Sequence, residues 1–168
     1  VPDMKGMELS YRFFNEVMYP LLKNEYPSLL DKCAFGLAGE GSECYGYDDE
    51  FSRDHDFSPL CCIFVPHSFY KEYYPLINEM LKKLPNYYDG YYLGLDNPVI
   101  ASRRGPIDIE DFLMKYLNSR TIPDDLLKWN DIPSHYLSTA INGAVFMDNE
   151  GTLTKIREIL QKGYPEAV

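Results

Sequence analysis

Positive charge is scarce in this sequence of 168 residues, which has 16 lysines and arginines against 26 aspartates and glutamates. The formal net charge of −10 argues against an extended nucleic-acid partner, because a long footprint needs basic side chains to displace counterions from many phosphates. A small cationic partner, or one bridged by a metal ion, suits an acidic chain better. A negative net charge can also serve only to keep a protein soluble. The charge therefore favours some classes of partner but does not identify one.

Cysteine is also sparse, and Cys33, Cys44, Cys61 and Cys62 do not predict a disulfide framework in a chain of this length. Their spacing does not match a zinc site either. Cys33, Cys61 and Cys62 lie in apolar runs typical of strands, where we expect buried free thiols. No apolar run reaches the length of a membrane span. These absences predict a reduced, soluble, cytoplasmic protein without a membrane partner.

Histidine occurs three times, and none of the three stands in the Ser/His/Asp or Cys/His spacing of a hydrolase. We interpret His55 as a packed or hydrogen-bonded side chain. His67 and His135 are interpreted as helix-capping or surface residues. Nucleophilic catalysis of the hydrolase kind is therefore not expected.

Apolar and aromatic residues, in contrast, are plentiful. A hydrophobic fraction of 45%, with 15 tyrosines and 9 phenylalanines, excludes a disordered chain. The length suits one domain with a substantial core, and the sequence has no internal repeat or linker. We therefore expect a single domain over residues 1–168.

The hydrophobic pattern predicts helices near both ends of the chain and strands between them. The predicted helices cover residues 7–25 with a kink or new turn at Pro20, residues 67–84, and segments that follow residues 109, 133 and 151. The predicted strands cover residues 33–38, 60–65, 91–95, 99–102 and 107–109, with a turn at residues 86–90. This order predicts an α+β fold with a mixed central sheet flanked by helices.

A polar segment at residues 39–57 lies between the first two predicted strands and contains a glycine-rich turn, a serine and many carboxylates. Asp54 and Asp56 are the most informative pair, because a strand sends residues i and i+2 to the same face, about 7 Å apart. Both carboxylates can then reach one cation, while His55 points the other way. Buried strands on both sides would fix this segment in space.

Gly41-Ser42 followed by Asp54-His55-Asp56 resembles the signature of the nucleotidyltransferase (polymerase beta-like) superfamily. That signature has a Gly-Ser turn after the first strand and Asp-x-Asp on the next strand. A longer string resembles one bacterial branch of the superfamily, known mainly as a domain of unknown function. The residues of this string are Gly41-Ser42-Glu43-Cys44, Gly46, Asp48-Asp49-Glu50, Ser52 and Asp54-His55-Asp56, and the likeness continues at Ile107–Ile109 and Asn142–Asp148. The resemblance implies a nucleotidyltransferase-like domain, and because members of this branch are usually longer, a C-terminal helical part beyond residue 168.

Nucleotidyl transfer needs positioning and charge neutralisation more than a reactive side chain. Two Mg²⁺ or Mn²⁺ ions held by carboxylate oxygens can clamp the attacking and leaving oxygens. Asp54 and Asp56 would supply most of this cage, and Asp108 is the expected third ligand, with Glu110 as its substitute if the register differs. Carboxylates around one metal-free cleft repel, so Asp108→Asn is expected to raise the melting temperature without metal.

Gly41 and Ser42 form the predicted phosphate site, because backbone amides at a helix start and a serine hydroxyl bind anions. Arg53 and Arg103, with the adjacent Arg104, are the positive charges expected near the cleft, where they can hold the triphosphate. Salt bridges to the protein's own carboxylates explain these arginines equally well. The run at residues 48–50 is either a solvated loop or an acidic rim for a basic acceptor or the metal.

These features predict a metal-dependent nucleotidyltransferase. It would move a nucleoside monophosphate from a triphosphate such as ATP to a hydroxyl of a small cationic molecule or a protein. The alternative is a non-catalytic nucleotide-binding or protein-interaction module, for example one half of a toxin–antitoxin pair. Three carboxylates that bind metal would permit catalysis, but a protein with all three could still bind nucleotide without catalysing a reaction.

Overall fold

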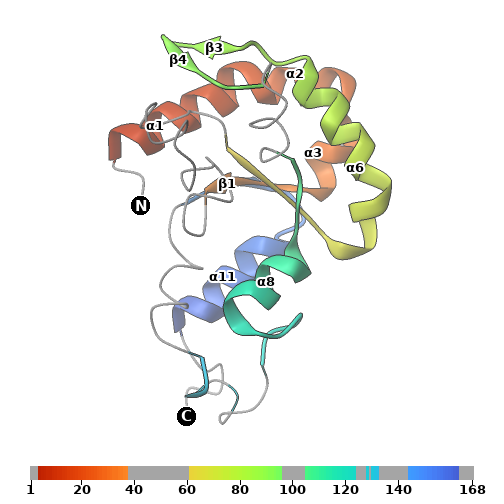
Figure 1. Cartoon of the computed structure of the whole chain (residues 1–168), viewed down its shortest axis with the longest axis vertical. Coiled ribbons are helices and arrows are strands. Elements are labelled where there is room, and N and C mark those ends of the chain that lie inside the picture. Colours follow the sequence, from red (N-terminus) through yellow and green to blue (C-terminus); the bar gives the residue numbers. More distant parts are fainter. Residues whose placement is uncertain are drawn as a thin grey trace.

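The computed structural model of the chain describes residues 4–37, 61–95, 105–123, 128, 130–132 and 144–162. These residues form helices and a mixed sheet, which confirms the α+β class (Figure 1). The elements are α1 (Met4–Phe13), the π-helix η1 (Phe14–Met18), α2 (Tyr19–Glu25), α3 (Pro27–Lys32), β1 (Ala34–Leu37), β2 (Cys62–Val65), α6 (His67–Lys82), β3 (Tyr87–Tyr88), β4 (Tyr91–Tyr92), β5 (Ile107–Asp108), α8 (Ile109–Leu117), β6 (Ala144–Asp148) and α11 (Thr152–Lys162).

The main sheet has four described strands in the order β5-β2-β1-β6. β1 is antiparallel to both of its neighbours, β2 and β6, whereas β5 is parallel to β2. A parallel pair needs a crossover connection, and α6 lies between β2 and β5 in the chain. The sheet is therefore mixed, as the sequence predicts.

Helices cover both faces of this sheet. Phe35 of β1 packs against Phe14 of η1 with ring centroids 5.3 Å apart, and Phe64 of β2 packs against Phe112 of α8 at 5.4 Å. Because Phe35 pairs with Ile63, strand alternation places Phe35 and Phe64 on opposite faces. The N-terminal helices thus lie on one side of the sheet and α8 on the other, and Figure 1 shows α11 beside α8.

The N-terminal helical segment is continuous from Met4 to Glu25 and confirms the helix predicted over residues 7–25. Pro20 occupies the first turn of α2, where its missing N–H costs little. The π-helix just before it buries Phe14 and Met18 in the core. A proline therefore starts a new helical element here, which is one of the two expected outcomes.

The tyrosine-rich segment after α6 differs from its prediction. β3 and β4 pair with each other as a separate two-stranded sheet, so they do not extend the main sheet, and the strand predicted over residues 91–95 contains only Tyr91–Tyr92. The turn is confined to Asp89 and Gly90, both with positive φ, which is the geometry of a two-residue hairpin turn. The strand predicted at residues 99–102 lies outside the described residues.

The remaining described elements agree with the sequence in part. α6, α8, α11, β1, β2 and β5 lie where helices and strands are predicted. β6 is not among the strands that the sequence predicts, and the helix expected after Pro133 lies outside the described residues. Of the helices described, none is long and apolar enough to cross a membrane.

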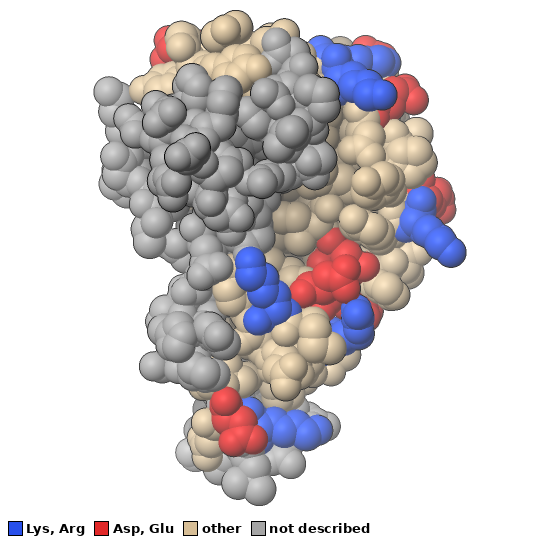
Figure 2. All heavy atoms as spheres, viewed as in Figure 1, with Lys and Arg blue, Asp and Glu red and all other residues tan. Residues whose placement is uncertain are grey.

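Charged side chains of both signs adjoin one another on the face shown in Figure 2. The described residues form ion pairs such as Lys83–Glu25 at 2.6 Å and Arg120–Asp111 at 2.9 Å. These pairs are exposed, so they contribute little to stability.

Candidate functional site

The signature segment is attached to the sheet by two neighbouring strands. β1 ends at Leu37 and β2 begins at Cys62, and Gly36 pairs with Cys62 across the antiparallel ladder. The chain therefore leaves the sheet and returns to it at the same end of this strand pair. The predicted site residues Gly41, Ser42, Arg53, Asp54, Asp56 and Arg103 lie outside the described residues, as do Asp48, Asp49, Glu50 and Arg104.

Gly36 allows β6 to approach β1 very closely just before this segment. A Cβ at this position would overlap the carbonyl oxygen of Ala144 and lie 2.9 Å from Cα of Val145. The register between β1 and β6 also shifts between Phe35 and Gly36. Only glycine fits here, because the obstructing atoms belong to the backbone and cannot rotate away.

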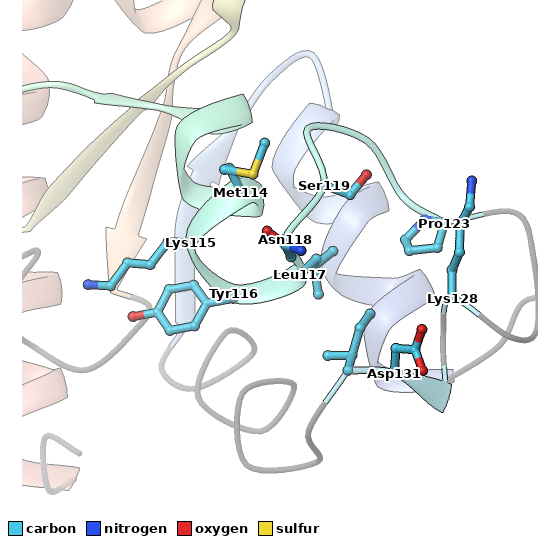
Figure 3. A pocket seen from close by; sticks show the side chains of 10 residues that line it. Met114, Lys115, Tyr116, Leu117, Asn118, Ser119, Pro123, Lys128 and Asp131 are labelled. Atoms are coloured by element: carbon cyan, nitrogen blue, oxygen red, sulfur yellow. The ribbon is translucent and has the colours of Figure 1, made fainter.

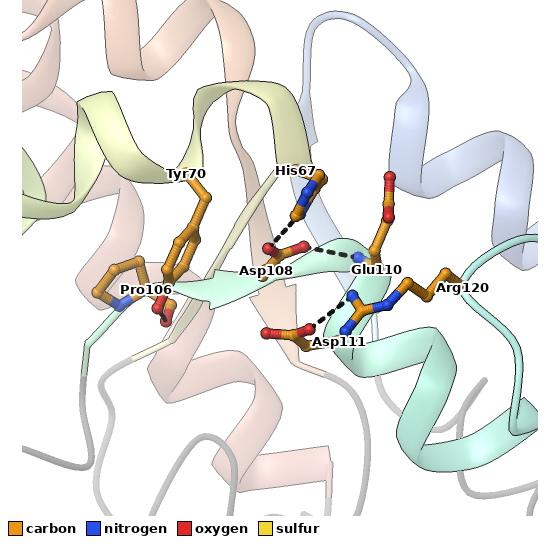
Figure 4. A network of polar contacts seen from close by, with 7 residues as sticks. All are labelled: His67, Tyr70, Pro106, Asp108, Glu110, Asp111 and Arg120. Atoms are coloured by element: carbon orange, nitrogen blue, oxygen red, sulfur yellow. Dashed lines mark hydrogen bonds and ion pairs between the residues drawn. The ribbon is translucent and has the colours of Figure 1, made fainter.

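Asp108 ends β5 and is the predicted third metal ligand that the structure describes. Its side chain is only 4% exposed, and it occupies the N-cap of α8 (Figure 4). Oδ1 accepts a hydrogen bond from the backbone N–H of Glu110 at 2.9 Å, and Oδ2 lies 2.7 Å from Nδ1 of His67. Both carboxylate oxygens therefore already have partners inside the protein.

His67 is the neighbour of Asp108 that sequence reasoning missed. Its side chain is at the surface, as one of the two interpretations holds, but Pro66 and not His67 is the N-cap of α6. It starts α6 after Pro66, and its ring is 55% exposed although Nδ1 meets a buried carboxylate. The hydrogen bond and charge of Asp108, followed by the charge of Glu110, raise the pKa of His67. No local signal links His67 with a residue 41 positions away, because only the parallel pairing of β2 and β5 brings them together.

Asp108 and the point where the signature segment joins the sheet lie at opposite ends of β2. Asp108 pairs with Val65, the last residue of β2, whereas the segment joins at Cys62. Three residues of strand correspond to about 10 Å. Asp108 is thus held by His67 at the end of β2 away from the point where the segment joins the sheet.

Glu110, the substitute ligand, lies in the first turn of α8, where a negative charge is favourable. The described ranges contain no group of three or more histidine, cysteine or acidic side chains that could hold a metal ion. The predicted metal pair is not part of those ranges.

The cysteines depart from the prediction at one position. Cys33 and Cys61 are buried free thiols, as expected, and burial raises the pKa of each to about 12. Cys62 is disulfide-bonded, so its expected free-thiol state is wrong. Composition and an apolar setting predict burial, but they do not reveal whether another sulfur lies within bonding distance.

A cavity of about 440 Å³ lies at the C-terminal end of α8 (Figure 3). Its lining includes the apolar side chains of Leu117 and Ile132 and the polar side chains of Ser119 and Lys128. Asn118 ends the helix in the left-handed conformation. Asp108, the predicted site residue that the structure describes, is not among the described residues that line this cavity.

Comparison with known proteins adds one finding. A family model described as Domain of unknown function (DUF4037) matches residues 129–168, whose described part contains β6 and α11. In this unit Asp148 accepts hydrogen bonds from the backbone N–H groups of Gly151 and Thr154 and so joins the end of the strand to the helix. No curated protein and no solved structure matches the chain. The match therefore concerns a strand–helix unit that packs on β1 and carries no stated activity.

Proposed function

We propose that the chain is a metal-dependent nucleotidyltransferase that moves a nucleoside monophosphate from a triphosphate to a hydroxyl of a small-molecule or protein acceptor. The observation that carries this proposal is the antiparallel pair of β1 and β2, whose facing residues Gly36 and Cys62 hold the two ends of the signature segment. A glycine-rich turn after one strand and Asp-x-Asp before the next are thereby attached to one end of a mixed sheet. That arrangement supports a phosphate turn and a metal pair in one place.

The predicted site residues form two groups, one that binds the phosphates and one that binds the metal. Gly41 and Ser42 bind the triphosphate through backbone amides and a hydroxyl. Asp54 and Asp56 hold Mg²⁺ or Mn²⁺, because these hard cations prefer carboxylate oxygens. The metal neutralises charge on the phosphates while an acceptor hydroxyl displaces pyrophosphate.

Two further roles complete the proposal. Arg53 and Arg103 neutralise the leaving pyrophosphate. The acceptor is a small cationic molecule or a protein side chain, since a net charge of −10 disfavours extended nucleic acid. Asp108 is the proposed third metal ligand, and its hydrogen bond to His67 would then orient the carboxylate.

A second candidate is a nucleotide-binding or protein-interaction module without turnover. The observation that favours it is the state of Asp108, whose two oxygens are engaged by His67 and by the N–H of Glu110. A cage reduced to Asp54 and Asp56 can still bind one metal and a nucleotide. It lacks the third carboxylate that clamping a second ion requires.

The deciding experiment measures binding of the four common triphosphates with Mg²⁺ or Mn²⁺, together with pyrophosphate release over a panel of amine-bearing and protein acceptors. Asp54→Asn and Asp56→Asn should each reduce divalent-dependent binding or turnover by more than about 100-fold, because loss of a direct ligand exceeds the usual cost of losing a supporting group. Asp31→Asn, at an exposed position of α3, is the matched control and should behave like the parent.

The outcomes separate the two candidates. Binding with pyrophosphate release supports the transferase, and binding without release over the whole panel supports the module. If neither Asp54→Asn nor Asp56→Asn alters binding, the metal assignment is wrong.

A further inference from the structure

The cavity at the C-terminal end of α8 combines buried apolar side chains with exposed charged ones (Figure 3). Its volume of about 440 Å³ lies in the range of small-molecule sites. Of the described lining, Leu117, Pro123 and Ile132 are buried, whereas Lys128 and Asp131 are exposed. We propose that this cavity binds a free amino acid with an apolar side chain, whose carboxylate pairs with Lys128 and whose ammonium group pairs with Asp131.

Lys128 and Asp131 are opposite charges on one turn of the chain. The backbone N–H of Asp131 donates to the carbonyl oxygen of Lys128 at 3.3 Å, which fixes the two residues relative to each other. Side chains three positions apart on such a turn are close enough to form an ion pair. Neither side chain, however, has a hydrogen bond or an ion pair with the residues that the structure describes. Both charged groups therefore stay available to a ligand.

The balance of charge around the cavity selects a ligand that carries both signs. A simple anion bound to Lys128 would lie near Asp131 and near the C-terminal end of α8, which has a partial negative charge. A simple cation bound to Asp131 would lie near Lys128. An amino acid avoids both repulsions, because its carboxylate and its ammonium group are joined through one carbon atom.

Lys115 does not upset this balance. Its Nζ lies 5.3 Å from the centroid of the Tyr116 ring, a cation–π contact. Figure 3 shows its side chain extending away from Leu117. The positive charge that remains for the carboxylate of the ligand is therefore that of Lys128.

The buried part of the lining favours an apolar side chain on the ligand. Leu117, Pro123 and Ile132 offer no side-chain hydrogen bond, so a polar side chain would be buried against them at a cost. Ser119 already donates its hydroxyl to the carbonyl oxygen of Thr121 at 2.8 Å. Asn118 adds a carboxamide, which can donate to the carboxylate or accept from the ammonium group.

The cavity and Asp108 lie at opposite ends of α8. Asp108 caps the start of the helix, and the nine residues of α8 correspond to about 13 Å. The proposal does not rest on the proposed function, because its test uses neither metal nor nucleotide.

The test is isothermal titration calorimetry of the full chain with leucine, methionine and phenylalanine. N-acetylleucine, which lacks the positive charge, and leucinamide, which lacks the negative charge, are titrated beside leucine. Each derivative should bind at least about tenfold more weakly, because it loses one charge-assisted hydrogen bond. Serine should also bind more weakly than leucine, since it brings little apolar surface to the buried lining.

Two variants assign the charged groups. Lys128→Met and Asp131→Asn change exposed side chains, and each should weaken leucine binding by about tenfold without lowering the melting temperature. Asp131→Asn should leave the affinity for N-acetylleucine unchanged, because that ligand has no ammonium group. Lys128→Met should likewise leave the affinity for leucinamide unchanged.

Further variants serve as controls. Lys71→Met in α6 and Asp31→Asn in α3 make the same changes at exposed positions outside the cavity and should bind leucine like the parent. Asn118→Gly removes the carboxamide but suits the left-handed end of α8, so it should weaken leucine binding while the helix end is retained.

Each outcome supports or overturns the proposal. Leucine binding that falls in both charge variants and not in their controls supports it. Absence of binding by all three apolar amino acids overturns it, as does equal affinity for leucine and its two derivatives. Leucine binding that is unchanged in Lys128→Met and Asp131→Asn would place the site elsewhere on the chain. An equal loss for leucine and N-acetylleucine in Asp131→Asn would overturn the pairing of the ammonium group with Asp131.

Discussion

The two ends of β2 offer opposite surroundings. At its first residue, Cys62, the strand pairs with β1, which is itself paired on its other side with β6. At its last residue, Val65, it pairs with Asp108, whose carboxylate binds His67 at the start of α6. At the first end, the backbones of β1 and β6 pack closely beside the point where the signature segment joins the sheet. At the other end, a polar contact joins the first residue of α6 to the residue before α8.

This difference shows what residue spacing can and cannot establish. Asp54, Asp56 and Asp108 together suggest a three-carboxylate cage, because each stands in or beside an apolar strand. The register places Asp108 at the far end of β2 from the attachment point of the segment. Asp108 is therefore both the proposed metal ligand and the partner of His67, and variants of the residues that pair with the two ends of β2 test these contacts.

The largest effect is expected at Gly36. A Cβ introduced by Gly36→Ala would overlap backbone atoms of Ala144 and Val145, so β1 and β6 would have to move apart. Overpacking against a rigid backbone should lower the free energy of unfolding by about 3 kcal/mol or more. Urea denaturation of the parent and the variant measures this loss.

Gly105→Ala is the matched control for that measurement. Among the described residues, a Cβ at Gly105 would meet the side-chain oxygen of Asn78 at 3.7 Å, an ordinary contact. The change should therefore stay within about 0.5 kcal/mol of the parent. Equal losses for the two variants would show that β6 does not pack on β1 as described.

A smaller effect is expected at Asp108, and its sign shows which of the two roles governs stability without metal. Asp108→Asn keeps an acceptor for the N–H of Glu110 but removes the charged partner of His67, so the metal-free melting temperature should fall. If Asp108 instead shared a metal-free cleft with Asp54 and Asp56, relief of repulsion would raise that temperature. Thermal unfolding without metal distinguishes the two directions.

Asp108→Ala extends this test, because it also removes the helix cap and should cost about 1 kcal/mol. Asp111→Asn is the control, since the Asp111–Arg120 pair is exposed on both sides and should contribute little. A rise in melting temperature for Asp108→Asn would restore the three-carboxylate cage.

The sequence predicted the elements better than their partners. Apolar runs place β1 and β2, and apolar periodicity places α6 and α8, because burial of one face or stripe leaves a local pattern. β6 was missed although Val145 and Phe146 are apolar, and its pairing with β1 depends on Gly36, more than 100 residues earlier. The hydrogen bond of His67 to Asp108 likewise depends on long-range register, which no local pattern records.

The smallest expected effect is the pH dependence of the contact between His67 and Asp108. Asp108 and Glu110 raise the pKa of His67 in the folded protein, while desolvation and, to a smaller extent, the charge of Arg120 oppose this rise. A raised folded pKa contributes stability that is fully present below the unfolded value, about 6.5, and is lost as the pH rises through the folded value. His67→Gln should therefore destabilise the protein more at about pH 6 than at about pH 9, where only a neutral hydrogen bond is lost. Urea denaturation at both pH values measures the difference, and the same substitution in the Asp108→Asn background should show none of this pH dependence. An effect of His67→Gln that does not change with pH would mean that His67 and Asp108 do not interact as a charged pair.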